Sequence, residues 1–369
     1  MKKRRSILLV SNAFQPEISP RSYRATELAK EFSRQGHEVT VITKYRDHDY
    51  TAFIEEYNIR FLMWKKTVFP GVPKFRRQPL SLLSRLTSRT LSLLFEYPKI
   101  EEVLRVKNIL RTENEYDLMI SFAVPYTIHW GVAWSRSGKH RIADTWVADC
   151  GDPYMGDVMD SFRKPFYFGY IEKWFCRKAD YISIPIRDAM DGYYPEFHDK
   201  IRIIPQGFDF DLKELSKGET TGNNIPEFAY AGTFIKGSRD PGPLMEYLCN
   251  LDLPFRFYVY TNRQDMLDEF KERLENKLII SGYIPRSELM EKMSDMDFLI
   301  NFDNNSSRHL PSKLIDYALT GRPVLNVKME FSGDEIRAFL TGDYSKRMVL
   351  PDPEDYHIKH VSRLFLEIN

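Results

Sequence analysis

A segment near residue 315 holds the side chains and backbone groups that a phosphate site needs. From position 309 it reads His-Leu-Pro-Ser-Lys-Leu-Ile-Asp. Pro311 favours the first turn of a helix, because its missing N–H costs no hydrogen bond there. The free N–H groups of Ser312 and Lys313, together with the Lys313 ammonium, would form an anion site suited to a diphosphate. Asp316, one turn further on, could accept hydrogen bonds from hydroxyl groups. An ordinary helix with a solvated lysine is the alternative.

Another candidate for phosphate contact lies earlier in the chain, between Tyr230 and Arg239. Gly232 follows an apolar run, and its lack of a side chain lets the backbone approach a ligand closely. Arg239 or Lys236 can clamp a diphosphate through charge-assisted hydrogen bonds.

The elements that must position these residues follow an alternating pattern. Short apolar runs alternate with longer amphipathic segments, which is typical of β-α-β units around parallel sheets. Strands are predicted at 6–11, 38–43, 118–122, 141–148, 181–184 and 201–204, and then at 228–231, 255–260, 278–281, 298–302 and 323–327. Helices are predicted near 23–34, 243–250, 265–274, 288–294 and 311–319.

A polar stretch interrupts this alternation. Residues 206–226 are rich in Gly, Asn and Thr, which predicts a linker. We therefore expect an N-terminal Rossmann-like domain at 1–205 and a C-terminal one at 227–369. The predicted fold class is α/β, with two doubly wound lobes facing each other across a cleft. Open sheets of this kind bind ligands beyond the carboxyl ends of their strands.

Composition excludes several classes of protein. The 369 residues suit two such lobes, and 43% hydrophobic with 28% charged residues is ordinary for a globular protein. A net charge of +1 argues against a nucleic-acid binder. The three cysteines are scattered, so a reducing, cytoplasmic compartment is expected. Walker, paired-His, Cys-pair and Gly-x-Gly-x-x-Gly motifs are absent, so neither a metal nor a nicotinamide cofactor is expected.

The segment from Trp64 to Ile100 has an uneven charge. It contains eight Lys or Arg and one acid, a net charge of +7. Its leucines are interleaved with arginines, so a helix here could bury leucines at a lipid headgroup boundary while arginines meet anionic lipid. The sequence therefore predicts a peripheral membrane surface that includes Arg76, Arg77, Arg85 and Arg89. Packing of the leucines against the lobe is the alternative. No apolar run is a convincing transmembrane span.

In order and spacing, these segments resemble the GT-B glycosyltransferases, specifically the large retaining family 4 of bacterial polysaccharide assembly. Residues 7–16 and 36–43 resemble the family's opening unit, and 201–209 its turn into the hinge. Residues 230–239 resemble the start of the C-terminal lobe, and 281–285 the loop that cradles the nucleotide base. The segment at 309–325 resembles the nucleotide-binding helix, and the resemblance covers nearly the whole chain.

The resemblance implies a role for each of these residues. Asp316 would bind the ribose, and the base would lie against Gly282, Tyr283 and Ile284. The donor diphosphate would be held by Gly232, Lys236, Arg239, Ser312 and Lys313. Several positions depart from the family's pattern, Gly151 among them. Arg308 stands where a second acid often faces the donor sugar, and Thr233 stands where an arginine is customary.

An acidic segment at 147–154 is similar to one that ends in Asp-Pro-Trp in related transferases. Asp149 and Asp152 would lie at the end of a strand, and Asp152 is the better candidate for an acceptor-side carboxylate. Capping of the following turn by both acids is the alternative. His129 follows the third predicted strand and could lie near the reacting sugar, and a core histidine is the alternative.

The implied function is transfer of a hexosyl unit from a UDP- or GDP-linked sugar to a lipid-linked or saccharide acceptor, with retention of configuration. The pathway would be cell-surface polysaccharide biosynthesis at the inner face of the membrane. The cationic site would make a metal ion unnecessary. Two alternatives stay open, a nucleotide-sugar 2-epimerase and a non-catalytic nucleotide-sugar-binding protein of the same fold.

Overall fold

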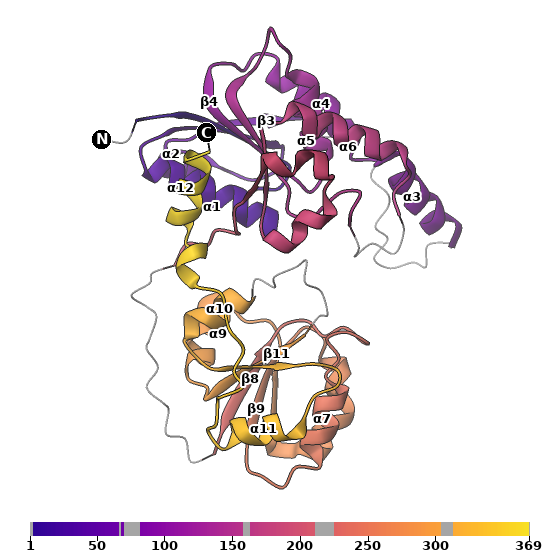
Figure 1. Ribbon diagram of the computed structural model, residues 1–369, viewed down its shortest axis with the longest axis vertical. Coiled ribbons are helices and arrows are strands. Elements are labelled where there is room, and N and C mark those ends of the chain that lie inside the picture. The colour runs from indigo at the N-terminus through magenta and orange to yellow at the C-terminus, as the bar shows by residue number, and fades with distance from the viewer. Residues whose placement is uncertain are drawn as a thin grey trace. The chain divides into compact units, whose positions relative to one another are not determined.

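The structure is a computed structural model that describes residues 3–65, 68–69, 82–157, 163–210, 225–303 and 313–368. Backbone contacts divide the chain into two compact units. The first unit comprises Met1–Asp209 together with His357–Asn369, and the second comprises Phe210–Tyr356 (Figure 1).

The first unit is built on a parallel sheet of seven strands in the order β3-β2-β1-β4-β5-β6-β7. The strands are β1 (Ser6–Ser11), β2 (Glu38–Lys44), β3 (Arg60–Trp64), β4 (Tyr116–Phe122), β5 (Ala143–Asp149), β6 (Tyr181–Ile184) and β7 (Ile201–Ile203). The α-helices are α1 (Pro20–Arg34), α2 (Thr51–Tyr57), α3 (Leu82–Phe95), α4 (Glu101–Leu110), α5 (Thr127–Ser135), α6 (Tyr167–Lys178) and α12 (Ile358–Leu366). Two 3₁₀ helices, Arg187–Gly192 and Pro195–Lys200, precede β7.

Both faces of this sheet are covered, which is the reason that its strands read as nearly continuous apolar runs. One hydrophobic core joins the sheet to α1, α2 and α12, and the other joins it to α4, α5 and α6. Figure 1 shows these two groups of helices on opposite sides of the strands. Helix α1 begins at Ser19, whose hydroxyl accepts a hydrogen bond from the Ser22 N–H, and Gly36 follows its end with φ +85°.

A buried ion pair ties α1 to the sheet. The Arg24 guanidinium donates two hydrogen bonds of 2.7 Å to the Asp149 carboxylate at the end of β5. Ser183 on β6 donates a third to Asp149, and Arg24 also reaches the carbonyls of Ile204 and Pro205. Burial by itself would raise the pKa of Asp149, but the charge and hydrogen bonds of Arg24 outweigh it and hold the pKa below its usual value.

The last helix corrects the predicted domain boundary. Sequence analysis assigned everything from residue 227 to the C-terminal domain, but residues from His357 onward belong to the first unit. Helix α12 packs on α1 through an apolar face that includes Ile358, Val361 and Phe365. The Ile358 N–H also donates to the Phe208 carbonyl at 2.9 Å. This apolar face places α12 in the first unit, because it completes the hydrophobic core over α1. Of the predicted linker, residues 211–224 lie outside the described ranges.

The second unit has a parallel sheet of five strands in the order β10-β9-β8-β11-β12. The strands are β8 (Glu227–Ala231), β9 (Arg256–Tyr260), β10 (Leu278–Ser281), β11 (Phe298–Phe302) and β12 (Val324–Val327). The α-helices are α7 (Gly242–Cys249), α8 (Asp268–Leu274), α9 (Arg286–Ser294), α10 (Lys313–Thr320) and α11 (Gly333–Leu340). Helices α9 and α10 cover one face, while α7, α8 and α11 cover the other. The predicted α/β class with two doubly wound sheets is confirmed.

We predict that Arg24→Leu destabilises the first unit by about 3–5 kcal/mol, because it leaves a buried carboxylate without its partner. Urea-induced unfolding followed by tryptophan fluorescence measures the loss. Because the pKa of Asp149 is depressed, the stabilisation is present at neutral pH and disappears as the pH falls below about 4. The matched control is Arg34→Leu on the same helix, since its ion pair with Asp209 is exposed and contributes at most about 1 kcal/mol. Equal losses in the two variants would contradict the prediction.

Candidate functional site

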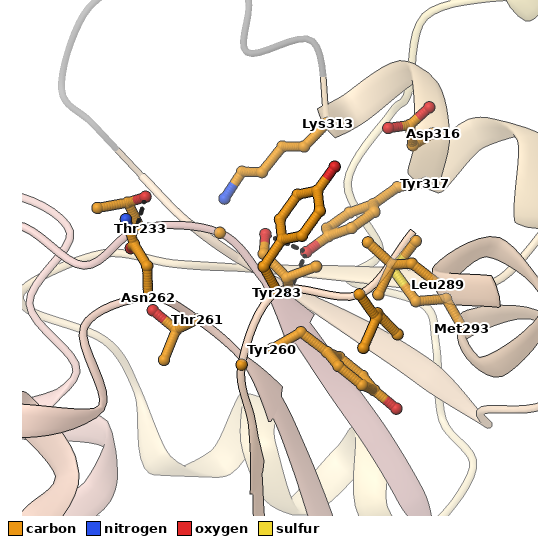
Figure 2. Close-up of a pocket in the computed structure, with 14 residues that line it drawn as sticks. Thr233, Tyr260, Thr261, Asn262, Tyr283, Leu289, Met293, Lys313, Asp316 and Tyr317 are labelled. Atoms are coloured by element: carbon orange, nitrogen blue, oxygen red, sulfur yellow. Dashed lines mark hydrogen bonds between the residues drawn. The ribbon is translucent and has the colours of Figure 1, made fainter. Parts of the chain in front are cut away.

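A cavity of about 270 Å³ opens in the second unit where β8, β9 and β10 end. Its lining comes from the residues that follow these three strands and from α9 and α10 (Figure 2). Strand β8 lies beside both β9 and β11, so the strand order reverses at this point of the sheet. Ligands of open α/β sheets bind at such a reversal, beyond the carboxyl ends of the strands.

Most of the donor-binding residues predicted in this unit line this one cavity. They are Gly232, Gly282, Tyr283, Ile284, Lys313 and Asp316. They are widely separated in sequence, and the parallel sheet brings them together. Lys236 is exposed and does not line the cavity, and Ser312 lies outside the described residues.

Gly232 fits its position for a steric reason. Its φ is +151°, a backbone conformation that other residues rarely adopt, and a Cβ there would lie 2.8 Å from the Tyr230 hydroxyl. The Gly232 N–H donates to the Tyr260 carbonyl at 3.0 Å, which ties the end of β8 to β9. Tyr317 fixes the same turn, because its hydroxyl accepts a hydrogen bond of 3.0 Å from the Ala231 N–H.

Lys313 brings an amine to the cavity that no described side chain pairs with. Its Nζ is shielded from solvent, has no hydrogen-bond partner among the described residues, and lies 4.6 Å from the centre of the Tyr230 ring. Figure 2 shows the ammonium extending from the start of α10 toward Thr233. Burial lowers the pKa of Lys313 to about 7, and the nearby positive charge of Arg239 adds to this effect. The Arg239 Nε is also buried without a hydrogen-bond partner.

Asp316 is held by an arginine that sequence analysis did not identify. Arg286, the first residue of α9, donates hydrogen bonds of 3.0 and 2.6 Å from Nε and Nη2 to the same Asp316 oxygen, Oδ1. Asp316 also lines the cavity. No sequence signal joins the two residues, because they are brought together only when α9 packs beside α10.

The rest of the cavity wall is apolar or uncharged. Tyr260, Leu289 and Met293 supply apolar surface, while Thr233 donates a hydrogen bond of 3.0 Å to the Asn262 side chain. These residues were not predicted. Tyr260 and Asn262 could have been found, because they follow a predicted strand at its carboxyl end, where such sheets bind ligands. Leu289 and Met293 could not have been identified as site residues from the sequence, because apolar residues on a helix are typical of ordinary packing.

The two acids proposed for catalysis, Asp149 and Asp152, lie in different environments. Asp149 is 1% exposed and bound by Arg24 and Ser183, so it serves the architecture of the first unit. Asp152 lies in the loop after β5, with a side chain 40% exposed and 4.0 Å from Arg21. Asp152 is therefore the acid of the pair that an acceptor could reach.

His129 lies in the core, which agrees with the alternative interpretation of this residue. Its Nδ1 is 2.8 Å from the Ser121 hydroxyl, and its Nε2 is 3.5 Å from the Cys150 sulfur. The ring is fully buried, and burial lowers the pKa of His129 to about 3. A histidine with this pKa is a poor general base near neutral pH.

Part of the predicted membrane surface lies outside the residues that the structure describes. Arg76 and Arg77 lie outside the described residues, and the Arg85 side chain is not described, whereas Arg89 is exposed on α3. Within the described residues, no helix is long and apolar enough to cross a bilayer. The same residues include no group of three or more His, Cys, Asp or Glu arranged to hold a metal ion.

No protein-family model matches the sequence, and no curated protein matches it. Solved structures do resemble the fold over nearly its whole length. A glycosyltransferase from Rickettsia africae ESF-5 is 12% identical with a TM-score of 0.60, covering 99% of this chain and 98% of its own. The lipopolysaccharide outer core galactosyltransferase WaaB, in its apo form, is 11% identical with a TM-score of 0.58 and 98% coverage of both chains.

A third structure was solved with a nucleotide. Anabaena Alr3699/HepE in complex with UDP is 13% identical with a TM-score of 0.56, covering 98% of both chains. Identities this low establish the fold alone. The chain therefore has the two-lobed GT-B fold of glycosyltransferases, as its sequence motifs predicted.

We predict that Asp316→Ala weakens binding of UDP more than binding of inorganic pyrophosphate, because its proposed partner is the ribose. Isothermal calorimetry with both ligands measures the difference. Arg286→Ala should produce a smaller loss in the same direction, since it frees the Asp316 carboxylate without removing it. If Asp316→Ala weakens both ligands equally, Asp316 supports the helix rather than binding the ribose.

Proposed function

We propose that this protein is a glycosyltransferase that takes a sugar from a nucleoside diphosphate donor bound in the cavity of the second unit. The observation that carries the proposal is the shielded amine of Lys313, which has no hydrogen-bond partner among the described residues and lies near the guanidinium of Arg239. A buried cation without a partner is costly unless a ligand supplies the opposite charge. The donor diphosphate supplies it, with the ribose at Asp316 and the base against Gly282, Tyr283 and Ile284.

The chemistry follows from where charge develops. Transfer breaks the bond between C1 of the sugar and the diphosphate oxygen, so negative charge grows on the departing phosphate. Lys313 and Arg239 would stabilise that charge from fixed positions, which is the largest contribution such a site can make. No metal ion would be required. We further propose that configuration is retained and that the departing phosphate or Asp152 accepts the proton from the acceptor hydroxyl.

Two of the structural neighbours are consistent with this donor. Alr3699/HepE was solved with UDP and with UDP-glucose, and WaaB is named as a galactosyltransferase. By analogy, the proposed donor here is a UDP- or GDP-linked hexose. The proposed acceptor is a lipid-linked or saccharide intermediate of cell-surface polysaccharide biosynthesis at the cytoplasmic face of the membrane.

An apolar patch on the first unit supports a lipid-linked acceptor. Phe95 on α3 is 58% exposed, and Phe166 and Tyr170 at the start of α6 are 78% and 71% exposed. The Tyr167 hydroxyl donates to the Leu94 carbonyl, so the end of α3 and the start of α6 lie side by side. Arg89, on the same helix as Phe95, and Arg163, three residues before Phe166, are also exposed, and exposed aromatic rings together with basic residues suit an anionic lipid surface.

A panel of nucleotide-sugars tests the function directly. We expect UDP-glucose, GDP-mannose or a related donor to raise the melting temperature, since a ligand at 100 times its Kd adds about 2.7 kcal/mol. Transfer to an acceptor should continue in EDTA. Lys313→Ala and Arg239→Ala should each weaken donor binding by about 1.5–3 kcal/mol, or roughly 10- to 150-fold. Lys271→Ala, which removes an exposed lysine paired with Asp268 on α8, is the control.

Product analysis separates the remaining possibilities. Appearance of an epimerised nucleotide-sugar without an acceptor would identify an epimerase, and tight binding without turnover would identify a binding protein. Absence of binding by the whole panel, or unchanged affinity in both the Lys313 and Arg239 variants, would reject the proposed site.

The membrane proposal is tested by sedimentation with vesicles. We expect the protein to bind vesicles that contain phosphatidylglycerol at low salt and to be released by salt. Replacing Phe95, Phe166 and Tyr170 with Ser should abolish binding, and replacing Arg76, Arg77, Arg85 and Arg89 with Ser should weaken it, since each basic residue near a charged leaflet contributes about 1 kcal/mol. Val349→Ser removes an exposed apolar side chain from the second unit and serves as the control. Binding unaffected by either set of changes would contradict the proposal.

A further inference from the structure

Among the residues that the structure describes, the groups around Lys313 include none that could neutralise a positive charge on it. The rings of Tyr230 and Tyr317 lie 4.6 and 5.9 Å from its Nζ. Neither ring is an anion near neutral pH, because burial raises the pKa of Tyr230 to about 12 and raises that of Tyr317 further. Thr233 and Asn262, on the turns after β8 and β9, are uncharged and hydrogen-bonded to each other.

The charged groups near Lys313 do not compensate for it either. Arg239, in the turn after β8, has the same sign of charge and makes the protonated lysine less favourable. The carboxylate on the same helix, Asp316, is bound by Arg286 from α9. In Figure 2 the Asp316 carboxylate lies on the side of Tyr317 away from the Lys313 ammonium. The described residues thus leave a shielded amine next to a guanidinium, with no acid to pair with it.

We propose that donor binding brings a proton to the site: Lys313 is a neutral amine before the donor arrives and becomes an ammonium ion when the diphosphate lies beside it. This inference rests on the proposed function and specifies how the same site operates. The balance is simple. One proton moves from solvent to the Lys313 Nζ for each donor bound, and no bond of the donor is broken.

The direction of the pH dependence follows from linkage. With a pKa of about 7, Lys313 is mostly protonated at pH 6, so binding takes up almost no proton there. A neighbouring diphosphate restores the pKa toward the usual value near 10.4. Between these values binding takes up close to one proton, and donor affinity falls by up to about tenfold per pH unit as the pH rises. The phosphates of the donor do not titrate in this range, because both are esterified.

Calorimetry with UDP-glucose and GDP-mannose measures the proton directly. The heat of binding at pH 8.5 is compared in Tris and in a sulfonate buffer that contains no phosphate, whose ionisation heats differ, so the difference gives the number of protons taken up. We expect close to one proton at pH 8.5 and close to none at pH 6. Lys313→Arg should abolish the uptake, since arginine stays protonated throughout. Lys313→Met should also abolish it, and the exposed-lysine control Lys271→Met should retain it.

A titration of the free protein provides an independent check. In protein labelled with carbon-13 at the lysine ε position, the NMR signal that disappears in Lys313→Arg should titrate near pH 7, far below the other lysines. A Lys313 signal that titrates near pH 10 overturns the inference, and so does donor binding without buffer-dependent heat at pH 8.5. If neither nucleotide-sugar binds, the proposed function fails and the inference fails with it. Binding without proton uptake rejects the inference alone.

Discussion

Parallel pairing of the strands is the constraint on which both units depend. Every pairing between the named strands of the two sheets is parallel, so each strand ends at the same edge of its sheet as its neighbours. Polar residues that follow different strands therefore gather at one edge, although long helices separate them in sequence. This brings Asp149 beside Ser183 in the first unit. In the second unit it brings Gly232, Asn262 and Gly282 around one cavity.

The same constraint explains how far the sequence predicts the fold and the site. Strands such as Ser6–Ser11 and Phe298–Phe302 are buried on both faces, so their apolar runs mark them within one or two residues. Strand β3 was missed because it lies at the edge of its sheet and only Trp64 of its residues is fully buried. Helix α12 was assigned to the wrong domain because amphipathicity reveals an apolar face but not the core that the face completes.

The candidate site also contains residues that the sequence predicted and residues that only tertiary packing reveals. Gly232, Lys313 and Asp316 were predicted as one site because their residue types and order suit phosphate and ribose, and they do line one cavity. Arg286 was missed because its role depends on a partner brought close only by packing of α9 against α10. Asp149 has the residue type of a catalytic acid, yet it is a structural one, because Arg24 reaches it across the sheet edge from α1. Residue type therefore predicts which chemistry is available, and tertiary contacts decide whether a given residue performs it.

Asp149 and Lys313 are shielded ionisable groups that differ in one respect: described side chains pair with Asp149 but not with Lys313. The fold supplies Asp149 with a guanidinium and a hydroxyl, so its charge is satisfied in every state of the protein. Among the described residues it supplies Lys313 with two aromatic rings and a second cation, so a positive charge on Lys313 would need a partner other than these groups. Gly232 and Tyr317 hold the surrounding turn through backbone hydrogen bonds that need no ligand. If Lys313 is neutral in the free protein, as proposed, its positive charge forms only when an anion lies beside it, and the surrounding turn needs little rearrangement at that moment. On the proposed function, such a site would favour the ligand whose negative charge increases during the reaction, which is the property required of a leaving-group site.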